Sequence, residues 1–438
     1  MSLKPLFLFA CTLCALPLMA QKNYTLTSPD GTLQATVATG SDLRISLSAD
    51  GETLLAPSLA DGPTAVCGDP ESRHGIILAK NEKAKAFGVQ TAETIWQAKR
   101  KCPDLRLVAP HRSEYVKFSR KCNELYLQYT DLVDPFGIDE SFLDVTGSMH
   151  LFGSGEHIAD ELRRRMREEV GLTISVGVSF NRAFAKLGSD YKKPDGTTVF
   201  SRENFKQRVW SLPANTLLYV GKRASDRLNR LGVRTIGELA ACDPAFIHSI
   251  LGKNGDLLLR YARGEDDEPV RSFYAEREVK SVGNSMTFAH NLLGADECRM
   301  GITALCDNVG RRLRKRGMVC QTVQLGIRDP EFHNRSRQVT LERPTNSTRA
   351  LIDLSMQLLL GHWPMDKPVR LLSVTAANLL PENQSCEQLS LFDAAEDIQK
   401  RDLQHKLVPT VVALRQKLGD QSVVFAHSVN TKDKTYKI

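Results

Sequence analysis

Two adjacent carboxylates, Asp139 and Glu140, stand within the apolar stretch Val133–Val145 and are the residues best suited to chemistry. An ionised carboxylate beside a hydrophobic core is costly unless a cation or a metal ion compensates its charge. Hard cations such as Mg²⁺ prefer carboxylate oxygens, and a pair of them can hold the attacking and leaving oxygens of a phosphoryl transfer. The stretch is therefore predicted to be a short buried strand that presents a metal site. The alternative is a strand end whose two acids face water.

The segments around this pair predict a mixed domain of helices and strands. Hydrophobic periodicity and β-branched runs indicate three helices and a second strand, in the order helix 113–129, helix 156–170, strand 172–178 and helix 181–191. The last helix ends in the turn sequence Lys192–Gly196. Consecutive side chains of a regular strand point to opposite faces, so Asp139 and Glu140 can share one site only if the strand bends or ends there. Gly137 would permit such a bend.

The bulk composition is that of a globular protein with several domains. The chain has 438 residues, of which 42% are hydrophobic and 25% charged, and its formal net charge is +7. This mildly basic balance is compatible with a polyanionic partner. The 10 cysteines follow no regular disulfide framework, which is typical of a reducing compartment and predicts a cytoplasmic protein.

The first sixty or so residues differ in character from the remainder. Residues 1–20 combine Lys4, an apolar run and a small residue at Ala20, which is the pattern of a secretory signal peptide and conflicts with a cytoplasmic location. Residues 21–60 predict a β-rich segment with a Pro-Asp-Gly turn. Residues 1–58 resemble the signal peptide and N-terminal segment of secreted family 97 glycoside hydrolases. This resemblance includes none of the hydrolase's catalytic barrel. It is the only support for the hypothesis of a secreted carbohydrate-active protein.

From about residue 63 to about residue 426, the chain resembles a different family. The segment Gly137–Thr146 reads GIDESFLDVT, and the segment Gly177–Gly196 reads GVSFNRAFAKLGSDYKKPDG. Both are similar to catalytic motifs of the Y-family translesion DNA polymerases, in particular the bacterial DNA polymerase IV group. The two motifs are long and stand in the family's order and separation. The resemblance therefore implies a template-directed DNA polymerase that acts in DNA damage bypass and repair.

The resemblance also assigns roles to individual residues. Asp139 and Glu140 would be catalytic carboxylates that bind two Mg²⁺ ions, and Lys193 would contact the phosphates of the incoming deoxynucleoside triphosphate. Lys85 occupies a position where many relatives have an arginine near the triphosphate, and Glu82 one where many have a tyrosine. Residue chemistry alone favours a solvated turn lysine for Lys193 and a helix-surface lysine for Lys85.

The family has a right-hand architecture, which implies an α+β multidomain fold preceded here by a foreign β-rich segment. Its parts would follow one another as fingers at 61–112, palm at 113–203, helical thumb at 204–270, little finger at 276–382 and a tail at 383–438. The resemblance further implies a monomer that binds primer-template DNA and has no membrane segment in the polymerase body.

Two basic regions are the predicted contacts to the DNA backbone. The thumb segment Tyr219–Leu239 is similar to a helix-hairpin-helix, in which a glycine turn presents backbone amides to a phosphate. The second region is the basic end of a little-finger helix. The predicted DNA-binding residues are Gly221, Lys222, Arg223, Arg314, Lys315 and Arg316. The alternatives are a structural helix turn and a solvated helix end.

The tail contains a short segment, Glu387–Asp393, that resembles the sliding-clamp peptide of bacterial polymerases. Such a peptide inserts apolar side chains into a groove of its partner. The residues that would bind the clamp are Gln388, Leu391 and Phe392.

One family motif has no counterpart in this chain. The family's first motif is a hydrophobic strand that ends in Asp-x-Asp and supplies a further metal-binding aspartate, and the hydrolase-like segment stands in its place. Asp42 and Asp50 flank the predicted strand 43–47, but aromatic residues do not follow either of them as in the family. A metal site that lacks a carboxylate should bind Mg²⁺ weakly. The second hypothesis is accordingly a catalytically inactive protein that binds DNA and the clamp.

Overall fold

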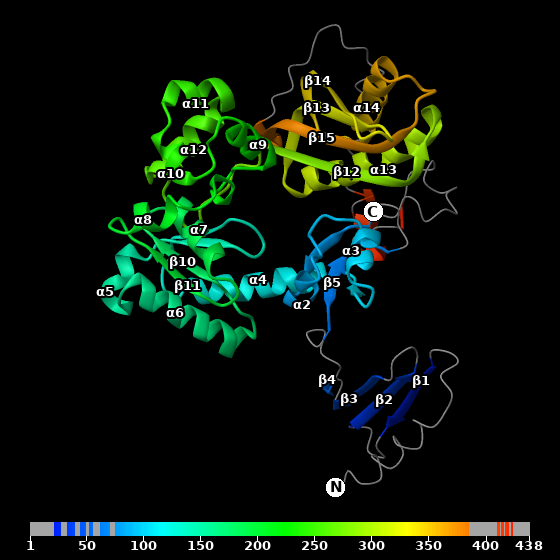
Figure 1. Ribbon diagram of the computed structural model, residues 1–438. Helices are drawn as coiled ribbons and strands as arrows, with labels where there is room; N and C mark the ends of the chain where they lie inside the picture. Colours follow the sequence, from blue (N-terminus) through cyan, green and yellow to red (C-terminus); the bar gives the residue numbers. More distant parts are fainter. Residues whose placement is uncertain are drawn as a thin grey trace. The chain divides into compact units, whose positions relative to one another are not determined.

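The computed structural model describes the backbone of residues 22–27, 33–39, 44–49 and 52–55, and residues 62–70, 75–384, 410–411, 413–415, 417–419 and 422–423. Contacts between residues divide the chain into two compact units, which are described one at a time below (Figure 1). The first comprises Met1–Pro110 and Glu278–Ile438, and the second is His111–Arg277. Within the described ranges, no helix is both long enough and apolar enough to cross a membrane. The signal-like residues 1–20 lie outside these ranges.

The N-terminal part of the first unit begins with a four-stranded antiparallel sheet of order β1-β2-β3-β4. Its strands are β1 (Lys22–Thr27), β2 (Leu33–Thr39), β3 (Arg44–Ala49) and β4 (Glu52–Leu55). They lie in the segment that the sequence predicted to be β-rich. Asp42 and Asp50, the aspartates that flank the predicted strand 43–47, lie outside the described residues.

A small α/β body follows within the same unit. Its three-stranded sheet has the order β6-β5-β7, and β5 pairs with β7 in parallel. The elements are β5 (Thr64–Cys67), β6 (Ile77–Lys80), α2 (Glu82–Ala86), α3 (Ile95–Lys101) and β7 (Arg106–Val108). Asn81 precedes helix α2, and its side chain accepts a hydrogen bond from the amide of Ala84 and so caps the helix.

The C-terminal part of this unit is a four-stranded antiparallel sheet with two long helices. The sheet order is β12-β15-β13-β14. The elements are β12 (Ser281–Leu292), α13 (Gly294–Lys315), β13 (Met318–Arg328), β14 (Asn334–Thr345), α14 (Thr348–His362), β15 (Val369–Pro381) and the short turn η4 (Glu382–Gln384). One hydrophobic core joins the buried sides of both helices to alternate residues of the strands, so the helices pack on the sheet (Figure 1).

The second unit starts with the part of the chain that carries the carboxylate pair. Its elements are α4 (Arg112–Tyr126), β8 (Val133–Pro135), β9 (Ser141–Leu143), η1 (Thr146–Ser148), α5 (Met149–Phe152), α6 (Gly155–Arg165), η2 (Met166–Val170), β10 (Val176–Ser179), α7 (Arg182–Tyr191) and β11 (Thr197–Phe200). Strands β8 and β9 form an antiparallel pair, and β10 and β11 form a parallel pair. Helix α7 connects the two parallel strands, which is the usual crossover for parallel strands.

Helix α7 lies unusually close to strand β10. Its first turn is capped by Asn181, whose side chain accepts a hydrogen bond from the amide of Phe184. A Cβ atom placed on Gly177 of β10 would lie 1.9 Å from the carbonyl oxygen of Ala185 and 2.5 Å from the amide nitrogen of Ser189. Both obstacles are backbone atoms of the helix, so a glycine is required at this position for α7 to pack where it does.

The turn after α7 is fixed by Asp195, whose backbone φ is +53°. This carboxylate accepts hydrogen bonds from Arg163 Nε at 3.1 Å and from Arg167 Nη1 at 2.5 Å, which ties the turn to helix α6 and the residues after it. Desolvation raises the pKa of the Asp195 carboxyl, but the hydrogen bonds from Arg163 and Arg167 outweigh it and leave the pKa below its ordinary value. The turn therefore depends on an ionised Asp195.

A helical part completes the second unit. Its elements are α8 (Phe205–Val209), η3 (Ala214–Thr216), α9 (Lys222–Arg230), α10 (Ile236–Ala241), α11 (Pro244–Leu251) and α12 (Lys253–Arg263). One core joins these helices to α7 and β11, and it includes Phe184, Phe200 and Phe205. Because this core is continuous, the helical part supports the position of α7.

We predict that Gly177→Ala destabilises the protein, because the new methyl group would collide with backbone atoms of α7 that cannot move independently. The free energy of unfolding should fall by roughly 1–3 kcal/mol or more, as measured by urea denaturation. Gly147→Ala is the matched control, because no atom lies within 4 Å of a Cβ at that position. Equal stability of the two variants would contradict the packing described for α7 and β10.

We predict that Asp195 makes the stability of the protein depend on pH under acidic conditions. Because its pKa is lowered in the folded state, its stabilising effect is fully present above the ordinary carboxyl pKa and is lost as the pH falls through the lowered value. Asp195→Asn lacks the ion pairs, but asparagine tolerates a positive φ. The urea midpoint of the variant should lie below that of the wild type at pH 7, and the gap should shrink at pH 3. A gap of equal size at both pH values would contradict this role.

Candidate active site

The carboxylate pair lies in the turn of a β-hairpin. Strands β8 and β9 pair from Val133 with Leu143 to Pro135 with Ser141, and the amide of Phe136 donates to the carbonyl of Glu140 at 2.9 Å. Asp139 is thus an exposed turn residue, and Glu140 is half-buried where β9 begins. The prediction of one buried strand that carries both acids is wrong. The apolar runs on either side pair with each other, and the two charges avoid full burial by lying at the bend.

A cluster of charges around the buried Asp134 supports the base of this hairpin. Asp134 on β8 is 7% exposed, and its carboxylate lies 3.3 Å from Arg182 Nη2 and 2.5 Å from Arg277 Nη2. The guanidinium of Arg182, in the first turn of α7, also lies over the ring of Phe142 on β9 at 4.4 Å from the centroid. These contacts link both strands of the hairpin to α7 and to the end of the unit.

A chain of ion pairs connects Glu140 to the predicted phosphate-binding lysine. Lys186 Nζ on α7 lies 3.1 Å from Glu140 Oε1 and 2.6 Å from Asp190 Oδ2. The other oxygen of Asp190 lies 2.6 Å from Lys193 Nζ. The structure thus brings Glu140 and Lys193 into one network, through two residues that the sequence analysis did not single out.

The charges in this network stabilise one another. Burial lowers the pKa of the Lys186 ammonium, but its hydrogen bonds to Asp190 and Glu140 outweigh that effect and raise it above the ordinary value. Burial likewise raises the pKa of Asp190, and hydrogen bonds from Lys186 and Lys193 bring it below the ordinary value. Lys186 and Asp190 are therefore charged at neutral pH. Helical spacing predicts the pairs within α7, but the contact to Glu140 depends on tertiary packing that the sequence does not reveal.

The donor atoms of the pair fit a hard divalent cation. Asp139 is exposed and Glu140 is half-buried, so their carboxylate oxygens can bind an ion that keeps several waters. Among the residues that the structure describes, no third acid, histidine or cysteine joins them in a group of three within ligand distance. The group of three such side chains that does occur among the described residues is in the other unit, at the turn between β13 and β14. It consists of Asp329, Glu331 and His333.

The second predicted nucleotide contact lies in the other unit. Lys85 on α2 is exposed, and its ammonium lies 3.2 Å from the carboxylate of Glu82 one helical turn earlier. An exposed pair of this kind contributes little to stability. Lys85 therefore has no evident structural task that would conflict with a role in binding phosphate.

The residues predicted to contact phosphate in the helical part lie at the start of helix α9. Gly221 is the N-cap residue of α9, and the exposed side chains of Lys222 and Arg223 occupy the first turn of that helix. Tyr219 has a backbone φ of +68° and is 49% exposed. Tyr219 therefore has a positive φ, at a position where a helix-hairpin-helix usually has glycine.

The three basic residues at the end of α13 differ in their surroundings. The guanidinium of Arg314 donates to the carbonyl of Asn346 at 2.7 Å and contacts the hydroxyl of Thr348, and burial lowers the pKa of this side chain. It therefore serves the packing of its own domain. Lys315 and Arg316 are exposed, which leaves them as the members of the set that a polyanion can reach.

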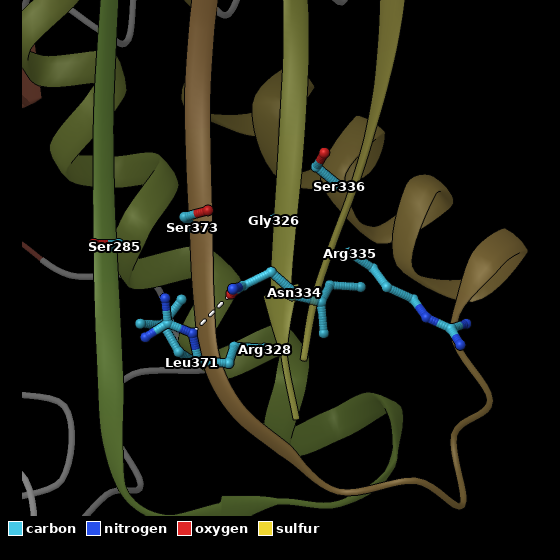
Figure 2. A pocket seen from close by; sticks show the side chains of 9 residues that line it. Ser285, Gly326, Arg328, Asn334, Arg335, Ser336, Leu371 and Ser373 are labelled. Carbon is cyan, nitrogen blue, oxygen red and sulfur yellow. Dashed lines mark hydrogen bonds between the residues drawn. The ribbon is translucent and has the colours of Figure 1, made fainter. Parts of the chain in front are cut away.

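The face of the sheet away from the two helices carries small polar side chains. The pairing register places Ser285, Ser373, Gly326 and Ser336 in one row across the strands. They border a hollow of about 360 Å³ whose lining also includes Arg328 and Asn334, joined by a hydrogen bond of 2.7 Å (Figure 2). Among the described residues, the lining of this hollow carries the cations Arg328 and Arg335 and no acid.

The predicted clamp-binding residues Gln388, Leu391 and Phe392 lie outside the described residues. Their role stays a prediction from the sequence.

Comparisons with known proteins place these observations in a family. A model of the impB/mucB/samB family matches residues 46–190, and a model of the C-terminal domain of that family matches residues 279–391. The DNA polymerase IV of Acetivibrio thermocellus is 44% identical over 372 residues, which cover 85% of this chain and 92% of that protein. DNA polymerase IV 2 of Bacillus subtilis is 34% identical over 388 residues, covering 87% of this chain and 92% of that protein.

A solved structure shares the fold. The Y-family DNA polymerase chimera Dbh-Dpo4(243-245)-Dbh matches with a TM-score of 0.64 at 22% sequence identity, over 73% of this chain and 92% of the other. At this level of identity the match concerns the fold alone.

Proposed function

The chain belongs to the impB/mucB/samB family and, within it, to the DNA polymerase IV group of Y-family polymerases, and from this premise we propose how its residues act. It is a template-directed DNA polymerase of the translesion type, whose substrates are primer-template DNA and deoxynucleoside triphosphates. The hairpin pair Asp139 and Glu140 binds the divalent cations, expected to be two Mg²⁺ ions. The observation that carries this assignment is the hairpin itself, whose bend carries the exposed Asp139 and the half-buried Glu140 as consecutive residues.

The protein's own groups prepare the site for nucleotidyl transfer. When bound, divalent ions supply activation of the primer hydroxyl and neutralisation of the leaving pyrophosphate. Glu140 is held by Lys186, while Asp139 stays accessible to solvent. Lys193 adds positive charge for the triphosphate. The assignment of Lys85 to the triphosphate rests on the sequence resemblance. These residues act by positioning the reactants and by stabilising negative charge, which are the main contributions of a protein to phosphoryl transfer.

The protein binds DNA through contacts to the phosphate groups. Support comes from the N-terminus of α9, with Gly221, Lys222 and Arg223, and from the exposed Lys315 and Arg316 at the end of α13. The polar face of the sheet offers hydroxyl groups and Arg328 to the same kind of ligand. Contacts of these kinds position a duplex without reading its sequence, which suits a polymerase that must accept any template.

The remaining assignments rest on the sequence pattern and on the thiols. The tail segment with Gln388, Leu391 and Phe392 docks on a sliding clamp, and the polymerase acts as a monomer. The cysteines that the structure describes are free thiols, and several are buried, which supports a reducing compartment and hence the cytoplasm.

A second function is favoured by one observation. Among the described residues, no third carboxylate completes a group with Asp139 and Glu140. A protein with this arrangement could bind DNA and the clamp without catalysing extension.

We predict that extension of a primer on a DNA template with Mg²⁺ requires the hairpin pair. Asp139→Asn and Glu140→Gln should each lower the rate by roughly 100-fold or more, because each removes a charge that the transition state needs. Glu124→Gln, which alters an exposed carboxylate on α4, is the matched control and should extend at the wild-type rate. Absence of extension by the wild type, with DNA binding retained, would establish the inactive alternative instead.

We predict that Lys315 and Arg316 contribute to DNA affinity through phosphate contacts. The double variant Lys315→Gln with Arg316→Gln should bind all sequences more weakly, and the slope of log affinity against log salt should fall by about one for each lost contact. Arg349→Gln on α14 is the control, because this exposed arginine pairs with Asp353 on its own helix. An unchanged salt slope in the double variant would exclude these residues from the interface.

A further inference from the structure

Lys186 occupies a central position between the metal site and the phosphate site. Its ammonium lies 3.1 Å from a Glu140 oxygen and 2.6 Å from an Asp190 oxygen, and its side chain is 18% exposed. Asp190 is shared, because its second oxygen lies 2.6 Å from Lys193. The four groups therefore form a line of alternating charge, Glu140, Lys186, Asp190 and Lys193.

The position of Lys186 is set by the helix that carries it. Phe184 and Leu187, its neighbours on α7, are buried, and the backbone of α7 lies against Gly177 of β10. The helix cannot shift without losing this packing. The ammonium is therefore held beside Glu140 by the fold, in contrast to an exposed lysine that could swing away.

The charges of the line cancel in the absence of a cation. Glu140 and Asp190 contribute two negative charges, and Lys186 and Lys193 contribute two positive ones. A divalent cation that binds Glu140 must approach an ammonium that already compensates this carboxylate. The divalent cation and the ammonium repel each other, and both are attracted to the same carboxylate, of which Lys186 contacts the Oε1 atom.

We propose that Lys186 is a positioning residue that competes with the divalent cation for Glu140 and couples cation binding to Lys193 through Asp190. This inference rests on the proposed function of Asp139 and Glu140. When a cation takes Glu140, Lys186 retains only Asp190 and attracts it more strongly. Asp190 then holds Lys193 less firmly, and the Lys193 ammonium becomes available to a triphosphate. Cation and nucleotide should accordingly strengthen each other's binding.

The test is a titration of the full chain with Mn²⁺, in which free Mn²⁺ is followed by electron paramagnetic resonance without DNA or nucleotide. Lys186→Met should bind Mn²⁺ roughly fivefold more tightly than the wild type, because the competing charge is gone. Lys186→Arg keeps the charge and should restore affinity close to the wild-type value. Lys117→Met is the matched control, because Lys117 belongs to an exposed pair with Glu114 on α4.

A double-mutant cycle tests whether the effect passes through Glu140. In a Glu140→Gln background, Lys186→Met should no longer tighten Mn²⁺ binding, because the contested carboxylate is absent. Deoxynucleoside triphosphate affinity, measured with and without Mn²⁺, should show less coupling in Lys186→Met than in the wild type. A melting temperature recorded for each variant separates these changes from a loss of folding, and Lys186→Gln replaces Lys186→Met if the latter does not fold.

The outcomes separate the two claims. Unchanged or weaker Mn²⁺ binding in a folded variant that lacks the Lys186 charge would overturn this inference alone, as would an effect that persists in the Glu140→Gln background. If Glu140→Gln and Asp139→Asn leave Mn²⁺ binding of the wild type unchanged, the proposed metal site fails, and this inference fails with it.

Discussion

An ionised carboxylate beside a protein core is costly unless a positive charge or hydrogen-bond donors face it, and the region around the hairpin is organised by this constraint. Asp134 beneath the hairpin faces Arg182 and Arg277, and Glu140 at the bend faces Lys186. Asp139 avoids the cost by remaining exposed. The acids of this short hairpin therefore differ in their partners: the buried Asp134 is paired with two arginines, Glu140 is paired with one lysine, and Asp139 is exposed to solvent.

Helix α7 provides most of this compensation. It contributes Arg182 in its first turn and Lys186 one turn later, and it ends just before Lys193. Its placement depends on Gly177, which lets the helix backbone touch the strand beneath it, and on Asp195, which fixes the turn that follows. Substitutions at Gly177 or Asp195, although far from the hairpin, can therefore weaken the ion pairs of its acids by moving helix α7.

Much of this arrangement could be predicted from the sequence, and the failures have physical causes. The long motifs around Asp139 and Lys193 identified the family, which the comparisons confirmed. The sequence could not show that three-residue strands would fold back into a hairpin, because the pairing energy of such short runs depends on their neighbours. It also could not show that the Arg314 side chain hydrogen-bonds to the carbonyl of Asn346 or that Lys186 pairs with Glu140. Both contacts join residues far apart in the chain, and no local pattern encodes them.

The most direct test of the account is a crystal structure of the protein with primer-template DNA, a non-hydrolysable deoxynucleoside triphosphate and Mn²⁺, with the metal located by its anomalous scattering. The account predicts a Mn²⁺ peak within ligand distance of the carboxylates of both Asp139 and Glu140. A peak at Asp329, Glu331 and His333 alone, with none at the hairpin, would contradict the assignment of the hairpin as the metal centre.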